Sequence, residues 1–140
     1  MNVTVRVSAP VYPTEIEDKV RTSVNNIFPI ELDLEDYGIP RLYGEGDIET
    51  LRKLHQLLRE GHILDTARHI LLTGIEGNTT QLSLNKQVAF AGKVNFSVGK
   101  ESLGSIYVDI STENENDILT IIDWLAPHTV DGKPEEEKEL

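Results

Sequence analysis

The feature that most constrains the fold of this chain is the way its apolar residues change spacing along the sequence. Near the start, Val3, Val5 and Val7 occupy every second position, which is the pattern of a strand with one buried face. From residue 16 the apolar residues instead recur every three or four positions, as they do along one side of a helix. Because the spacing switches several more times, we expect strands and helices to be interleaved along the chain.

Helical spacing predicts four helices, each with a polar residue that can cap its start or a glycine or proline that ends it. The first helix has Thr14 and Glu17 as a capping box at its start and Pro29 beyond its end. Asp47 caps the second helix and Gly61 ends it, Gly74 ends the third, and the fourth has Asn116 at its start and Pro127 at its end. We expect Gly61 to take the left-handed conformation and to join the second and third helices in a tight turn.

Period-two spacing predicts further strands at residues 30–34, 82–84, 88–98 and 106–110. The segment 88–98 has the most regular alternation, so we expect it to form a hairpin with 106–110. Residues 37–46 contain several glycines and a proline, which indicate a loop with at most a short extended piece.

This order of elements predicts an α+β fold, with a mixed or largely antiparallel sheet packed against helices. A chain of 140 residues has the size of one domain, which we place at residues 1–130. Residues 131–140 are charged and poor in apolar side chains, so we expect an acidic, disordered tail.

Composition excludes several classes of function. The chain has no cysteine, which rules out disulfides, thiolate zinc sites, iron–sulfur clusters and a cysteine nucleophile. It has neither a signal peptide nor an apolar run long enough to span a membrane, so we expect a cytoplasmic protein without a membrane partner. The net charge of −11 argues against DNA binding, although residues 41–100 are mildly basic.

Two groups of side chains have the composition of metal sites, namely His55, His62 and His69, and Glu31, Asp33 and Glu35. The histidines are seven residues apart and Gly61 interrupts them, whereas a two-histidine site on a helix needs a spacing of four. The three acidic side chains would lie about 7 Å apart along a strand and diverge. We therefore expect no metal and no cofactor.

A set of cations in the middle of the chain is the candidate RNA-binding surface, because phosphate binding needs several positive charges on one face. It consists of Arg52, Lys53, Arg59, Arg68, Lys86 and Lys93. Nearby acidic residues weaken this field. Phe90 and Phe96 are in phase with the valines of segment 88–98, so core packing is the better explanation for them than base stacking.

Four segments resemble the archaeal uncharacterised protein family UPF0201. They are Pro13-Thr14-Glu15, Ile63-Leu64-Asp65-Thr66-Ala67-Arg68, Leu84-Asn85-Lys86-Gln87, and Asp123-Trp124-Leu125-Ala126-Pro127 with Thr129, Asp131 and Gly132. The resemblance runs from Val3 to Gly132 and departs at Val88, where the family has a small residue. It implies a homodimer whose fold resembles that of the large-subunit ribosomal protein that binds the small ribosomal RNA. From these motifs the resemblance implies a set of candidate site residues, namely Asp65, Arg68, Asn85, Lys86, Gln87, Asp123, Trp124 and Pro127.

The sequence leaves three classes of function open. The first is a non-catalytic, homodimeric binding or regulatory domain, which we favour because no complete catalytic set of residues is recognisable. The second is a protein that associates with RNA or ribonucleoprotein, which would require cations clustered in space. The third is a small-molecule enzyme or sensor with a pocket at the dimer interface, which would require a buried, polar-lined pocket with perturbed carboxylates.

Overall fold

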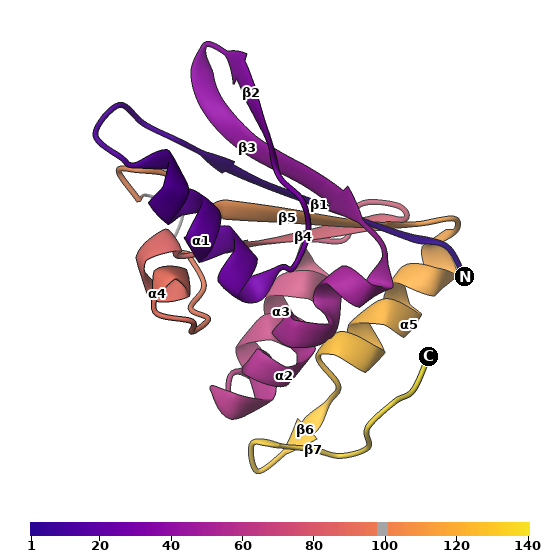
Figure 1. Ribbon diagram of the computed structural model, residues 1–140. Helices are drawn as coiled ribbons and strands as arrows, with labels where there is room; N and C mark the ends of the chain where they lie inside the picture. The colour runs from indigo at the N-terminus through magenta and orange to yellow at the C-terminus, as the bar shows by residue number, and fades with distance from the viewer. Residues whose placement is uncertain (98–100) are drawn as a thin grey trace.

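The computed structural model describes residues 1–97 and 101–140 (Figure 1). The strands are β1 (Val3–Pro10), β2 (Asp33–Tyr37), β3 (Ile39–Gly46), β4 (Thr79–Leu84), β5 (Ile106–Thr112), β6 (Thr129–Val130) and β7 (Lys133–Pro134). The helices are α1 (Glu17–Ile27), the 3-10 helix η1 (Ile48–Leu51), α2 (Arg52–Glu60), α3 (Leu64–Thr73), α4 (Lys86–Phe90) and α5 (Glu115–Leu125).

Five strands form one sheet in the order β2-β3-β1-β5-β4, and every neighbouring pair is antiparallel. The N-terminal strand lies at its centre, where Val5 is opposite Gly46 of β3 and Ile110 of β5. The predicted α+β fold with a largely antiparallel sheet is therefore confirmed.

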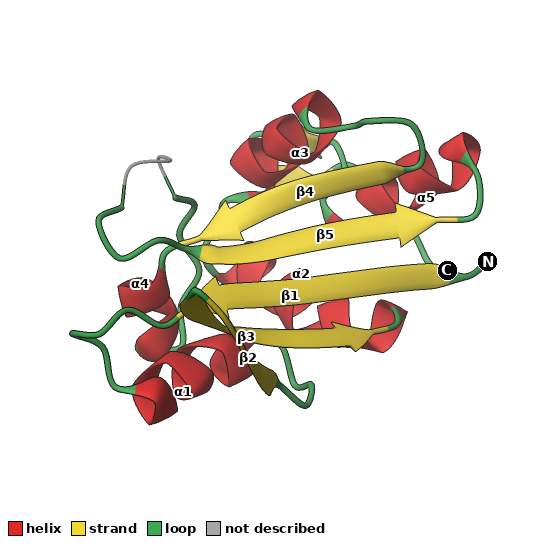
Figure 2. Cartoon of the chain, turned by 90° about the horizontal axis from the view of Figure 1, so that it is seen from above, coloured by secondary structure: helices red, strands yellow, loops and turns green. Residues whose placement is uncertain are grey.

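The described helices lie on the same side of the sheet (Figure 1). Alternation within each strand sends one set of side chains toward them, so that Val5 and Val7 of β1 and Val108 and Ile110 of β5 are fully buried. The other face of the sheet has no described helix over it, and Figure 2 looks directly onto it. The fold therefore has two layers, with the core between sheet and helices and one sheet face open.

The start of α1 differs from the prediction. The helix begins at Glu17, and no side chain caps it, so the capping box is wrong. A turn in which the Glu15 amide donates to the Tyr12 carbonyl places Thr14 outside the helix, and Glu17 instead pairs with Arg21 at 3.1 Å. The carboxylate of Glu15 serves a different purpose, described below.

The boundaries of the other long helices follow the sequence more closely. Asp47 caps η1, and α3 ends at Gly74, as predicted. Gly61 ends α2 but has a right-handed φ of −83°, and the left-handed residue is the neighbouring His62 with φ of 53°. For α5 the cap is Asn114, whose side chain accepts from the Asp117 amide, rather than Asn116.

The predicted strand at 88–98 is wrong. Residues Lys86–Phe90 form the short helix α4, because Asn85 caps it by accepting from the Val88 amide at 3.0 Å. From the second half of this segment, Phe96 makes a single bridge to Leu84, and Val98 lies outside the described residues. The antiparallel partners of β5 are consequently β4 and β1 rather than the segment 88–98.

Residues 37–46, predicted to be a loop, instead contribute an eight-residue strand. Gly38, with φ of +103°, turns the chain between β2 and β3, and Gly44 lies inside β3 opposite Val7. The predicted strand 30–34 is displaced along the chain, since β2 begins at Asp33. Leu34, which the alternation placed on the buried face, is 47% exposed. The glycines of this segment mark a hairpin turn and a close approach between chain segments rather than a loop.

The C-terminal residues form a small hairpin of β6 and β7 beyond α5, with Glu137 in contact with Arg59. The division of the chain at residue 130 and the disorder of residues 131–140 stay predictions. Among the helices in residues 1–97 and 101–140, none has both the length and the apolar character needed to cross a membrane.

Candidate functional site

The four segments that resemble UPF0201 meet in two pairs in the folded chain. Residues 13–15, which precede α1, contact the start of α4 through Glu15 and Lys86. Residues 63–68 of α3 contact the end of α5 through Arg68 and Asp123. Each pair joins segments more than 50 residues apart, so the motifs hold distant parts of the fold together.

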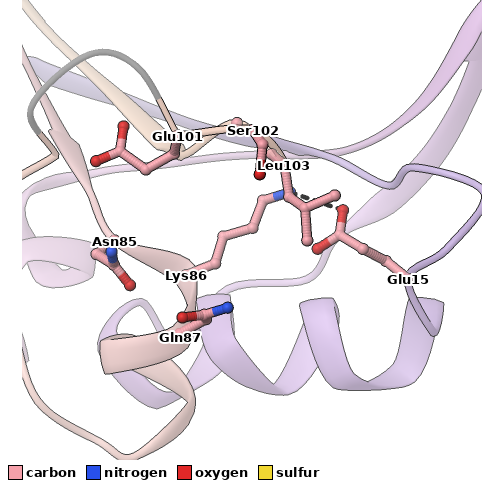
Figure 3. Close-up of a pocket in the computed structure, with 8 residues that line it drawn as sticks. Glu15, Asn85, Lys86, Gln87, Glu101, Ser102 and Leu103 are labelled. Carbon is pink, nitrogen blue, oxygen red and sulfur yellow. Dashed lines mark hydrogen bonds and ion pairs between the residues drawn. The ribbon is translucent and has the colours of Figure 1, made fainter.

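Lys86 is the centre of the first cluster (Figure 3). Its Nζ donates to the Leu103 carbonyl at 2.5 Å, the Pro10 carbonyl at 2.6 Å and the Glu15 carboxylate at 3.0 Å. The two charged side chains are 8% and 12% exposed. Burial lowers the pKa of Lys86, and the hydrogen bond that Lys86 donates to Glu15 acts in the opposite direction.

The contacts of Lys86 join four parts of the chain, namely the end of β1, the segment before α1, the start of α4 and the loop that precedes β5. An ammonium group has three donors, and all three are used. A hollow of about 180 Å³ beside it is lined by Gln87, Glu101 and Ser102 among others. Lys86 therefore has no donor left for a phosphate in this arrangement, and its contacts are those of a buried structural clamp.

The second cluster surrounds the C-terminal end of α5. Arg68 donates to Asp123 at 2.8 Å and to the Ala126 carbonyl at 3.1 Å, and Asp65 accepts from the Thr129 hydroxyl. Arg59 donates to the carbonyls of Leu125 and Trp124 as well. The last carbonyls of a helix lack partners within the helix, so these two arginines satisfy and stabilise that end.

Arg59 also binds the C-terminal tail. Its guanidinium makes two hydrogen bonds to the Glu137 carboxylate, at 2.6 and 2.8 Å, and this contact lowers the pKa of Glu137. Arg52 is exposed and pairs with Glu49 at 3.1 Å while lying 5.4 Å from the Trp124 ring. Both arginines thus already have carboxylate partners.

His55 stacks on Trp124 with ring centroids 4.7 Å apart. Burial lowers the pKa of His55, and the charge of Arg59 lowers it further. His62 and His69 are exposed on the turn and helix that follow. In the part of the chain that the structure describes, no group of three or more histidine and acidic side chains has the arrangement of a metal site.

Lys53 and Lys93 are the two predicted RNA-binding cations that are exposed and have no ion pair with another described residue. They come from different parts of the helical layer, α2 and the segment after α4. The six predicted cations are therefore spread over that layer, and four of them are engaged with carboxylates. Phe90, which we expected in the core, is exposed, whereas Phe96 packs against the core.

The open sheet face carries an aromatic group that the sequence analysis did not identify. Three of the chain's four tyrosines, Tyr12, Tyr37 and Tyr107, line a hollow of about 470 Å³ together with Glu35 and Arg41. The fourth, Tyr43 of β3, is opposite Ser8 of β1, which is itself opposite Tyr107 of β5. Tyr43 and Tyr107 alternate with the buried residues of their strands, and this phase was the sequence signal that places them on the open face.

The charges on this face are mixed. Arg6 lies between Glu45 and Asp109 in the strand register, and its distance to Glu45 is 3.9 Å. Of the three acidic residues predicted to share a strand face, Asp33 and Glu35 are on β2 at the edge of the sheet, whereas Glu31 precedes that strand. The face therefore offers aromatic rings and hydrogen-bonding groups rather than a concentration of positive charge.

The five-stranded antiparallel sheet, with helices on one side and an open face on the other, defines a two-layer α+β domain (Figure 2). A family model described as RNA binding matches residues 4–112, the stretch from β1 to the end of β5. A UPF0201 protein of Methanopyrus kandleri is 44% identical over 89% of this chain and 84% of its own length. The chain therefore belongs to the UPF0201 family, as the four segments indicated.

Other relatives agree with this assignment. A UPF0201 protein of Pyrococcus abyssi is 40% identical and covers 93% of this chain and 94% of its own length. The crystal structure of a UPF0201 protein from Methanococcus jannaschii superimposes with a TM-score of 0.85 at 37% identity, covering 95% of this chain and 99% of that one. These are proteins of an archaeal family without an assigned activity in their names.

Proposed function

We propose that this protein binds RNA through the open face of its five-stranded sheet. The observation that carries the proposal is that the face with no described helix over it also carries the exposed tyrosines and Arg6 and Arg41. The region matched by the RNA-binding family model, residues 4–112, contains all of this sheet except Val3, the first residue of β1. Sheets with exposed aromatic rings bind unpaired RNA bases by stacking.

The charge of the protein indicates which kind of RNA contact dominates. With a net charge of −11, the chain repels phosphates at long range. Stacking on tyrosine and hydrogen bonds to bases are short-range contacts that persist against this repulsion. We therefore expect single-stranded segments or loops to bind in preference to duplex RNA, whose bases are inaccessible.

The test is a fluorescence-anisotropy titration of labelled single-stranded and duplex RNA with two charge-matched variants. The open-face variant combines Arg6→Glu and Arg41→Glu, and the helix-side variant combines Lys53→Glu and Lys93→Glu. Both change the net charge equally and both alter exposed residues, so the comparison tests on which side of the molecule positive charge contributes to binding. We expect the open-face variant to bind single-stranded RNA at least tenfold more weakly and the helix-side variant to bind almost as the wild type does.

Salt dependence gives a second readout of the same experiment. Two arginine contacts predict a slope of about −1.4 for log K against log salt, taking about −0.7 for each phosphate contact on a single strand. A greater loss in the helix-side variant would move the site to the predicted cations on the helices. Absence of binding at low salt would exclude the proposed function.

We further propose that the protein is a non-catalytic homodimer of the cytosol. Ile16 and Phe90 are exposed and line a largely apolar groove between α1 and α4, a surface that a second copy could cover. Sedimentation equilibrium is expected to give twice the 15.7 kDa mass of one chain, and Phe90→Ser is expected to shift the population toward single chains. A wild-type mass of one chain at micromolar concentration would contradict the homodimer.

A further inference from the structure

The tyrosine-lined hollow on the open face has features that go beyond general RNA affinity. Tyr37 is 91% exposed and Tyr107 is 42% exposed, although both are large aromatic side chains. Together with Tyr12 they surround a space of about 470 Å³. Exposed rings around one hollow can stack on a flat ligand that enters it.

Two opposite charges in this hollow lack partners among the residues that the structure describes. Glu35 of β2 and Arg41 of β3 are directly opposite in the strand register, and both line the hollow. Neither makes a hydrogen bond or an ion pair with a described residue, whereas Arg6 and Glu45 on the same face approach to 3.9 Å. The hollow therefore presents the Glu35 carboxylate as an acceptor and the Arg41 guanidinium as a donor. These two groups suit a ligand that has both hydrogen-bond donors and a negatively charged group.

One wall of the hollow is fixed in place before any ligand arrives. The Nζ of Lys86 lies 5.5 Å from the centroid of the Tyr12 ring, a cation–π contact. On the same side, Gly104 packs so closely that an added Cβ would lie 2.7 Å from Pro10 and 3.5 Å from Tyr12. The buried clamp thus holds Tyr12 at the edge of the hollow, which lowers the entropic cost of binding there.

We propose that this hollow binds one unpaired guanine nucleotide of RNA, an inference that rests on the proposed function. Guanine presents two adjacent donors, N1–H and the N2 amino group, which match the two oxygens of the Glu35 carboxylate. Adenine and cytosine present one amino group beside a ring acceptor, which a carboxylate repels. Arg41 pairs with the phosphate and the tyrosines stack on the base.

The experiment uses decameric RNA made of uridine with one central guanosine, adenosine, cytidine or inosine. We expect the guanosine RNA to bind at least tenfold more tightly than the adenosine and cytidine RNAs, and the inosine RNA to fall between them because it lacks the N2 amino group. Tyr107→Leu is expected to weaken binding of all four by about tenfold, since stacking is insensitive to the base.

Glu35→Gln is the variant that tests base recognition, and Asp109→Asn is its control. Both convert an acidic side chain of the open face into its amide, but Asp109 lies outside the hollow. We expect Glu35→Gln to abolish the preference for guanosine and Asp109→Asn to retain it. Circular dichroism of both variants verifies that the sheet remains folded.

The outcomes separate this inference from the proposed function. The four RNAs could bind equally well to the wild type while the open-face variant, Arg6→Glu with Arg41→Glu, loses binding. In that case the sheet binds RNA, but the inference that the hollow recognises guanine is wrong. If Asp109→Asn removes the preference as fully as Glu35→Gln does, the hollow is not the recognition site. If only the helix-side variant loses RNA binding, both proposals are wrong.

Discussion

Replacing Lys86 with methionine is expected to lower the free energy of unfolding by about 3–4 kcal/mol, because removing one partner of a buried ion pair leaves the other charge uncompensated. Methionine fills much of the same volume, so the loss comes from the polar contacts. The carbonyls of Pro10 and Leu103 lose their donor, and the Glu15 carboxylate keeps only the Tyr12 amide. Urea denaturation followed by circular dichroism measures the change.

A matched control and a double variant make this result specific. Lys53→Met on the exposed face of α2 is expected to change stability by less than about 0.5 kcal/mol. Adding Glu15→Gln to Lys86→Met should restore part of the lost stability, because it removes the unpaired charge. A loss below about 1 kcal/mol in Lys86→Met would mean that the clamp contributes little.

The same lysine gives the cluster a dependence on pH. Burial lowers the pKa of Lys86 in the folded protein, so the unfolded chain binds this proton more tightly. Between the lowered value and the ordinary value of 10.5, the contribution of this group to stability therefore rises with pH. The difference in stability between wild type and Lys86→Met should grow across that window, which urea denaturation at a series of pH values measures.

Gly44→Ala is expected to lower the free energy of unfolding by about 2–3 kcal/mol through overpacking. An added Cβ would lie 2.5 Å from the carbonyl oxygen of Glu31 and 2.8 Å from the side chain of Ile30. The nearer atom belongs to the backbone, so β3 or the segment before β2 must move. Thermal and urea unfolding of the purified variant measure the effect.

Gly61→Ala is the control for this substitution. Gly61 has a right-handed φ of −83°, and the nearest atom to an added Cβ, the Leu57 carbonyl oxygen, is 3.3 Å away. We expect a change of less than about 1 kcal/mol. A comparable loss in both variants would show that the close approach at Gly44 is not the cause.

The sequence predicted the elements whose signals are local. Helices α2 and α3 and strands β1 and β5 followed from the spacing of their apolar residues, and Asp47 and Gly74 marked boundaries correctly. Strand β3 was missed because its glycines resemble loop residues, although Gly44 is required there by a contact with residues 30–31. Helix α4 was missed because Val88 and Phe90 imitate strand alternation while Asn85 caps a helix.

The candidate site depends on contacts that a sequence pattern does not contain. The motif segments were recognised from their resemblance to UPF0201, but the pairing of Glu15 with Lys86 follows only from the fold. The tyrosine-lined hollow joins residues of β2, β3, β5 and the segment after β1, which become neighbours through the strand register. Predicting it from sequence would have required that register.

The central position of β1 has a consequence for the time course of folding. Strand β1 pairs with β5 from Val3, opposite Thr112, to Ser8, opposite Tyr107. The β2–β3 hairpin and the α2–α3 pair involve neighbouring segments and can form early. Pairing of β1 with β5 instead closes a loop that contains all the chain between these two strands, which is entropically slow. On the ribosome, β1 must therefore remain with one edge unpaired until β5 (Ile106–Thr112) has emerged, a period in which this edge is most exposed to aggregation.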